Sequence, residues 1–142
     1  MPYVAVDASL AAKVAFAEQY SVETTALFGL WAGSEFQPVA PPLIIEELTN
    51  SVYKRLRRGD ISLDDALNAL VVLLELDIEV RDVGPAQALS LAHEHSLLAA
   101  YDGFYLALAK DRGCELWTAD ERLYNAVRVS LPWVHWIGEF RP

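Results

Sequence analysis

Short apolar segments of the kind found in buried strands recur along the chain, and one or two helical segments separate each from the next. The strand segments read YVAV (3–6), FQPVAPP (36–42), IEVRDV (78–83), CELWT (114–118) and WVHWI (133–137). The helices expected between them span residues 8–18, 21–32, 43–56, 63–74, 85–94, 101–112 and 120–127. Parallel strands need such crossovers, and strands covered by helices on both faces stay apolar throughout. The order therefore predicts an α/β fold with a central parallel sheet of four to five strands.

Length and composition fit one domain. The chain has 142 residues, of which 54% are hydrophobic, and shows no linker or internal repeat, so we expect residues 1–142 to form a single domain. Its N-terminal segment has no basic leader, and no apolar run approaches the ~18 residues that a membrane span requires. The lone Cys114 cannot form an internal disulfide. These features predict a cytoplasmic protein.

Four carboxylates are expected near one edge of the sheet. Asp7 follows the first strand, and Asp120 is the second residue after ELWT, so both belong at carboxyl ends of strands. Asp102 lies in the first turn of the helix that leads into ELWT, and a helix antiparallel to its next strand begins at that same edge. Glu47 comes early in the helix after the second strand, close to the same edge. Because ligands of parallel α/β sheets bind at the carboxyl ends of strands, we expect a site there.

Divalent cations would relieve the repulsion among these four side chains. Like charges in a cleft of low effective dielectric repel by several kcal/mol unless protons or cations intervene. Mg²⁺ and Mn²⁺ prefer oxygen ligands, so both fit a set of carboxylates. Zinc fits less well, because His93, His95 and His135 are not spaced with Cys114 as a Cys/His site.

Each acid also has a purely local interpretation. Asp7 and Asp120 can cap the helices that follow them, and Asp102 suits the positive end of a helix dipole. Glu47 taken alone reads as an exposed helix residue like its neighbour Glu46. Four separate coincidences at one sheet edge are harder to account for than one shared site, so we favour the site.

The aromatic residues near Asp102 are expected to pack rather than to bind bases. Tyr101, Phe104 and Tyr105 fall in a helix with many apolar residues, where large rings fill core and interface space. Cys114 has no basic partner in the sequence pattern and is interpreted as a small buried residue, not a nucleophile.

The overall charge is negative, but one basic cluster stands out. The formal net charge is −9, which argues against general nucleic-acid binding because phosphate contacts need cationic surface. Against this trend, candidate phosphate contacts gather in YKRLRRG on the helix of Glu47, with two more elsewhere. They are Lys54, Arg55, Arg57, Arg58, Lys13 and Arg122. For each single charge, a solvated surface role accounts equally well for its presence.

Three motifs taken together resemble the PIN-domain family, and in particular the bacterial VapC-type toxins. They are VAVDAS at the N-terminus, PPLIIEELTN with Glu47-x-x-Asn50, and AAYDGFYLALAKDRGCELWTAD. Each motif alone is weak, but their order along essentially the whole chain is specific. The resemblance implies a three-layer α/β/α fold and a ribonuclease that hydrolyses phosphodiester bonds with Mg²⁺ or Mn²⁺.

The resemblance also implies roles for individual residues. The metal-site positions fall on Asp7, Glu47, Asp102 and Asp120, with no departure at any of the four. Supporting positions fall on Thr118, Ser9 and Asn50. As partners, it implies an RNA substrate, a small antitoxin that inserts a segment into the acidic cleft, and a homodimer. The apolar segments 25–31 and 63–74 offer groove and dimer surface.

Two other functions remain open at this point. One is a non-catalytic module that keeps the fold for protein interaction, which intact acids disfavour. The other is a metal-dependent phosphatase-like protein that uses Asp7 as nucleophile, although VDASL lacks the second aspartate two residues on that such enzymes commonly have.

Overall fold

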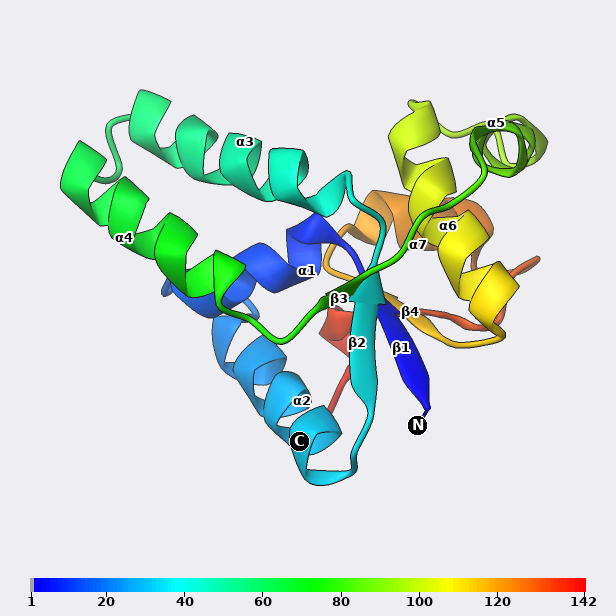
Figure 1. The fold of residues 1–142 in the computed structure, drawn as a ribbon, viewed down its shortest axis with the longest axis horizontal. Coiled ribbons are helices and arrows are strands. Elements are labelled where there is room, and N and C mark those ends of the chain that lie inside the picture. The colour runs from blue at the N-terminus through cyan, green and yellow to red at the C-terminus, as the bar shows by residue number, and fades with distance from the viewer. Residues whose placement is uncertain (1) are drawn as a thin grey trace.

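A five-stranded parallel sheet forms the centre of residues 2–142, the part of the chain described by the computed structural model (Figure 1). The strands are β1 (Tyr3–Val6), β2 (Gln37–Ala40), β3 (Glu79–Val80), β4 (Leu116–Thr118) and β5 (Val134–Trp136). Their order across the sheet is β3-β2-β1-β4-β5, and every neighbouring pair is parallel. The order reverses at β1, so the carboxyl end of β1 is the point where such sheets bind ligands.

Helices cover both faces of the sheet and complete three layers, as predicted. One face carries α1 (Ala8–Ala11), the 3₁₀ helix η1 (Ala12–Ala15), α2 (Ser21–Gly33), α3 (Ile44–Arg57) and α4 (Leu63–Leu74). The other face carries α5 (Pro85–Glu94), α6 (Ala100–Arg112) and α7 (Glu121–Val127), and a 3₁₀ turn η2 (Ile137–Glu139) follows β5. Figure 1 shows the two groups on opposite sides of the strands, with α3 and α4 side by side as an extended hairpin.

The core lies between these layers, and the central strands are buried on both faces. In β1, β2 and β4, Val4, Val6, Val39 and Leu116 are at most 2% exposed, whereas Tyr3, Gln37 and Trp117 are half-buried. Burial of apolar surface on both faces explains why these strands lack the alternating polar residues of a half-exposed sheet.

The segment after β1 differs from the prediction. We expected one helix over residues 8–18, whereas α1 and η1 end at Ala15 and Phe16 is extended. The chain turns here because Ser21 donates to the Phe16 carbonyl and accepts from the Glu18 N–H at 3.0 Å. These hydrogen bonds join residues on either side of the turn, and helix propensity gives no sign of them.

Elsewhere the structure differs from the prediction by a few residues at the ends of strands. The third strand is only Glu79–Val80, not the predicted 78–83, because the Arg81 N–H makes a last bond to the Ala40 carbonyl before the chain leaves the sheet edge.

Among residues 2–142 no helix is both long enough and apolar enough to span a bilayer.

Candidate active site

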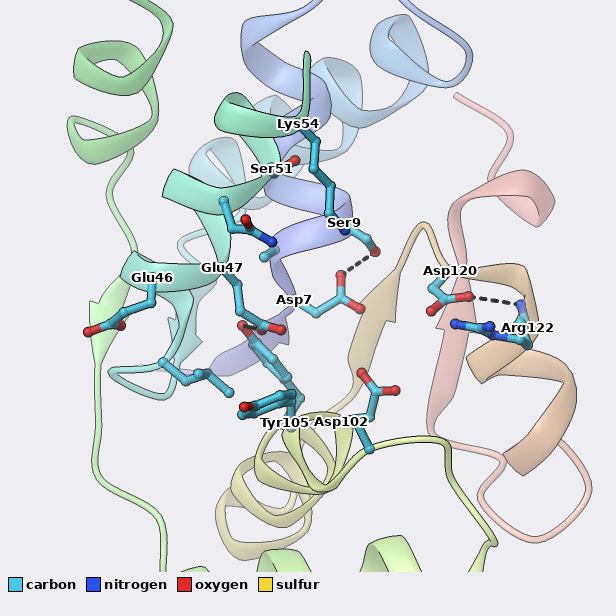
Figure 2. Close-up of a pocket in the computed structure, with 15 residues that line it drawn as sticks. Asp7, Ser9, Glu46, Glu47, Ser51, Lys54, Asp102, Tyr105, Asp120 and Arg122 are labelled. Carbon is cyan, nitrogen blue, oxygen red and sulfur yellow. Dashed lines mark hydrogen bonds between the residues drawn. The ribbon is translucent and has the colours of Figure 1, made fainter. Parts of the chain in front are cut away.

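The four predicted carboxylates all line one pocket at the carboxyl edge of the sheet. Its volume is about 780 Å³. The acidic side chains in its lining are Asp7, Glu46, Glu47, Asp102 and Asp120. Figure 2 shows Asp7, Glu47, Asp102 and Asp120 arranged around the pocket, whereas the Glu46 carboxylate points away from them. The topology explains the gathering, since β1 and β4 are neighbours and the helices of Glu47 and Asp102 begin at the same edge.

Asp7 lies deepest in the pocket. It is the N-cap of α1, only 5% exposed, and its Oδ1 accepts from the Leu10 N–H at 3.0 Å and the Ser9 hydroxyl at 2.7 Å. Its Oδ2 accepts from the Thr118 hydroxyl. Burial and, to a smaller extent, the charge of Asp102 outweigh these hydrogen bonds, which lower the pKa of Asp7, and raise it to about 7 overall. The carboxylate is thus held rigidly where its charge is costly without a cation.

Ser9 and Thr118 connect the ends of β1 and β4. Besides binding Asp7, the Ser9 Oγ accepts from the Ala119 N–H at 3.1 Å, and the Thr118 Oγ1 accepts from the Asp120 N–H at 2.9 Å. The two hydroxyl oxygens lie 3.2 Å apart. Both residues therefore orient an acid of the pocket.

Glu47 enters the pocket from α3, in the first turn after the helix begins at Ile44. Its Oε1 accepts from the Tyr105 hydroxyl at 2.6 Å. Burial raises the pKa of Glu47, although the Tyr105 hydrogen bond and the charge of Lys54 both lower it. The same burial and the negative charge of Glu47 raise the pKa of Tyr105, so the phenol stays protonated and donates.

Asp102 faces the other acids from the first turn of α6. Burial, together with the charges of Asp120 and Glu47, raises the pKa of Asp102 to about 6, while the charge of Arg122 lowers it. Repulsion among these carboxylates is therefore present, as the sequence predicted.

Asp120 is the N-cap of α7. Its Oδ1 accepts from the N–H groups of Arg122 at 3.0 Å and Leu123 at 3.2 Å. The local and the shared interpretations of the sequence thus coexist, because Asp7 and Asp120 both cap a helix and line the pocket.

The acids do not form a ready-made metal centre. Within residues 2–142, no group of three or more His, Cys, Asp or Glu side chains is arranged to hold an ion as it stands. Three of the carboxylates accept hydrogen bonds from the protein: from Ser9 and Thr118 for Asp7, from Tyr105 for Glu47, and from the α7 amides for Asp120.

The chemistry of the pocket nevertheless fits a hard divalent cation. Among the described residues, its lining offers carboxylate, hydroxyl and amide oxygens, which are the kind of ligand that Mg²⁺ and Mn²⁺ prefer. It contains no His or Cys, the ligands typical of Zn²⁺. The raised pKa values of Asp7 and Asp102 mark the charge that a cation would neutralise.

The structure divides the predicted RNA contacts into three groups. Lys54 and Arg122 line the pocket together with Asn50, and Figure 2 shows Arg122 beside Asp120. Arg57 is exposed at the end of α3 and outside the pocket lining, and Arg58 pairs with Asp60 at 3.0 Å.

Arg55 and Lys13 point elsewhere, contrary to their proposed use as phosphate contacts. Both bind the carboxylate of Glu18, Lys13 at 3.2 Å. Arg55 also donates to the Ser51 carbonyl at 2.9 Å and stacks over the Phe16 ring at 4.2 Å. Its side chain is only 14% exposed, so it fastens α3 to the turn before α2 instead of facing RNA.

Tyr105 is one of two pocket tyrosines that sequence reasoning missed. We expected it to pack in the core, and it is indeed 1% exposed, yet its hydroxyl reaches Glu47. The available signal was its spacing, since a residue three positions after Asp102 shares its helix face. Tyr101, also expected to pack, is 58% exposed and lines the same pocket.

Known proteins share this fold and sequence pattern. The family profile of the PIN domain matches residues 4–129. PAE2754 from Pyrobaculum aerophilum superposes with a TM-score of 0.68 at 23% identity, covering 97% of this chain and 85% of its own. VapC20 from Mycobacterium tuberculosis, described as a sarcin-ricin loop cleaving toxin, has a TM-score of 0.61 at 16% identity, covering 82% and 87%. No curated protein matches the chain. Because the family match extends over most of the sequence, the chain belongs to the PIN domain family.

Proposed function

We propose that the protein is a metal-dependent endoribonuclease. The observation that carries this proposal is the pocket in which Asp7, Glu47, Asp102 and Asp120 lie together with the cationic side chains of Lys54 and Arg122. PIN domains are in general nucleases, which agrees with this chemistry. An acidic site suits phosphodiester hydrolysis when cations are bound, because substrate and transition state are both negatively charged.

Mg²⁺ or Mn²⁺ would be held by the four carboxylates of the pocket. When bound, such an ion lowers the pKa of a water molecule and stabilises the leaving oxygen. The protein's own groups contribute the rest. Thr118 and Ser9 hold Asp7 in place, and Glu47 and Asp120 are the candidate acceptors for the proton of the attacking water. Lys54 and Arg122 donate to phosphate oxygens of the RNA, and Asn50 adds a neutral donor.

The proposed biological role is that of the toxin in a type II toxin-antitoxin pair, acting on RNA in the cytoplasm. The fold shared with VapC20, itself a toxin, supports this role. The partner would be a small antitoxin whose cationic segment enters the acidic pocket, as the net charge of −9 favours. We further propose that residues 1–142 form one domain and that two copies form a homodimer.

The deciding experiment compares two neighbouring acids on α3. Glu47→Gln removes the charge of a pocket carboxylate, and Glu46→Gln is its matched control because that carboxylate points away (Figure 2). Structured RNAs are incubated with each protein in Mn²⁺, Mg²⁺ or EDTA. We expect metal-dependent cutting by the wild type, a loss of about 100-fold in Glu47→Gln, and wild-type activity in Glu46→Gln.

The same assay separates the alternatives. A small phosphoester is included, and phosphate release from it without RNA cutting would indicate a phosphatase-like protein. Absence of both activities, in a protein that still binds a partner, would indicate an interaction module. RNA that stays intact with the wild type in every metal would overturn the proposed nuclease.

A further inference from the structure

Helix α6 contributes a phenol to the pocket as well as a carboxylate. Tyr105 and Asp102 lie three positions apart on this helix, and both line the pocket. The Tyr105 ring is buried, with 1% of the residue exposed, so packing fixes the direction of its hydroxyl. Tyr105 therefore differs from an exposed tyrosine, whose hydroxyl could reach several partners.

The hydroxyl meets Glu47, which comes from the opposite side of the pocket. The donor and acceptor oxygens are 2.6 Å apart and belong to residues separated by 58 positions in the chain. Among residues 2–142, this phenol is the side-chain donor that the structure gives Glu47. One hydrogen bond thus connects α6, which carries Asp102, with α3, which carries Glu47 and Lys54.

A free glutamate side chain at this position would sample several rotamers. Glu47 has three rotatable side-chain bonds, so without a partner its carboxylate could also turn out of the pocket. Repulsion from Asp102 favours rotation of Glu47 outward, and the Tyr105 hydroxyl opposes that rotation by offering a charge-assisted hydrogen bond.

We propose that Tyr105 is a positioning residue that keeps the Glu47 carboxylate turned into the pocket, where it can take part in cation binding. This inference rests on the proposed metal-dependent function. It assigns to a buried core tyrosine the part that outer hydrogen-bond partners play in other metal sites, where their removal costs about 10- to 100-fold in metal affinity or activity.

The test removes one oxygen atom. Tyr105→Phe keeps the ring and deletes the hydroxyl. Tyr124→Phe is the matched control, because Tyr124 is also buried and its hydroxyl donates to the Glu139 carboxylate, at 3.0 and 3.1 Å. Neither Tyr124 nor Glu139 lines the pocket. Mn²⁺ affinity is measured by calorimetry without RNA, and kcat and KM for RNA cleavage and Tm are measured separately.

We expect Tyr105→Phe to bind Mn²⁺ about 10- to 100-fold more weakly, with a lower kcat and an unchanged KM for RNA. Tyr124→Phe should keep the wild-type Mn²⁺ affinity and kcat. Wild-type Mn²⁺ affinity in Tyr105→Phe would overturn the inference while leaving the nuclease proposal intact. A wild-type protein that neither binds Mn²⁺ nor cuts RNA would instead overturn the proposed function, and the positioning role with it.

A double variant keeps the test decisive if Tyr105→Phe lowers Tm. If Tyr105 acts through the Glu47 carboxylate, adding Tyr105→Phe to Glu47→Gln causes no further loss of Mn²⁺ affinity. If the tyrosine matters only through packing, its loss adds to that of Glu47→Gln. Additive losses would therefore overturn the positioning role.

Discussion

Burial and hydrogen bonding have opposite effects on the pKa of Asp7. Burial raises its pKa to about 7, from an ordinary value of 3.8, although three hydrogen bonds from Thr118, Ser9 and Leu10 lower it. The protein thus surrounds the group with donors suited to a charge and yet withholds the solvent that would stabilise that charge. A cation in the pocket would resolve this conflict, which is the residue-scale argument for metal binding.

This conflict predicts how stability depends on pH without metal. Because the pKa of Asp7 is higher in the folded protein, the folded state retains a proton that the unfolded chain has lost between pH 4 and 7. Its stabilising contribution is full below pH 4 and is lost as pH rises through 7. In EDTA, we expect the free energy of unfolding to fall by up to about 4 kcal/mol over this range, measured by urea denaturation.

Asp7→Asn should reduce that pH dependence. It should not abolish it, because Asp102, whose pKa is raised to about 6, acts in the same direction. Asp111→Asn, an exposed position on α6, is the control and should keep the wild-type slope. If the free energy of unfolding changes equally with pH in the wild type and in Asp7→Asn, then Asp7 is ionised at ordinary pH in the folded protein.

At this scale the sequence located the acids but not their partners. Asp7 and Asp120 could be placed near one edge because they follow strands, and Glu47 and Asp102 because their helices begin at that edge. The hydroxyl of Tyr105 could not be assigned to Glu47, because that contact depends on how two helices from distant parts of the chain face each other.

Among the helices, α5 and α6 pack closely at Gly103, the residue after Asp102. A Cβ atom at Gly103 would lie 2.2 Å from the Ala88 carbonyl oxygen, which is far inside contact distance. Glycine is therefore required here by the approach of a neighbouring helix rather than by its backbone angles. Asp102 precedes Gly103 in α6, so this close packing lies directly beside a pocket residue in the chain.

Gly103→Ala should therefore destabilise the protein by about 1–3 kcal/mol, because α5 and α6 must separate. Gly29→Ala in α2 is the opposite case, since nothing lies within 4 Å of its Cβ, and we expect stabilisation by about 0.5–1 kcal/mol. Urea denaturation of both variants measures the difference. Equal stability of Gly103→Ala and wild type would mean that the two helices are less tightly packed than the structure shows.

Element order was predictable, whereas several element ends were not. The helices over residues 63–74 and 85–94 match the prediction, because the Ser62 cap and a proline as first helical residue, Pro85, are signals of contiguous sequence. The helix expected to reach residue 18 ends early because Ser21 binds Phe16 and Glu18 across a turn. Glu18 is also bound by Arg55 and Lys13 from other parts of the structure. Those contacts also remove Arg55 and Lys13 from the predicted RNA surface.

For the whole molecule, an exposed apolar stripe on α4 bears on the proposed homodimer. Its four residues, Leu63, Leu67, Val71 and Leu74, are 59, 53, 53 and 49% exposed and share one helix face. An apolar face of this kind on a protein with a net charge of −9 is a candidate for contact with a second copy.

Leu67→Lys combined with Val71→Lys should convert the proposed dimer to a monomer, because lysine cannot be buried in an apolar interface without loss of hydration. Light scattering should then report half the wild-type mass. Val129→Lys, at a residue 90% exposed on another part of the surface, is the control and should leave the mass unchanged. A wild-type protein with the mass of one chain would refute the homodimer.

The sequence by itself determined the parallel α/β order and the strand ends at which the acids lie, because periodicity, caps and strand polarity are properties of contiguous residues. Only the tertiary structure decided which hydrogen bonds those acids accept, which cations remain beside them and how strongly burial raises the pKa of Asp7 and Asp102. These properties depend on distances and solvent exclusion between residues far apart in the chain, and such distances are set by packing.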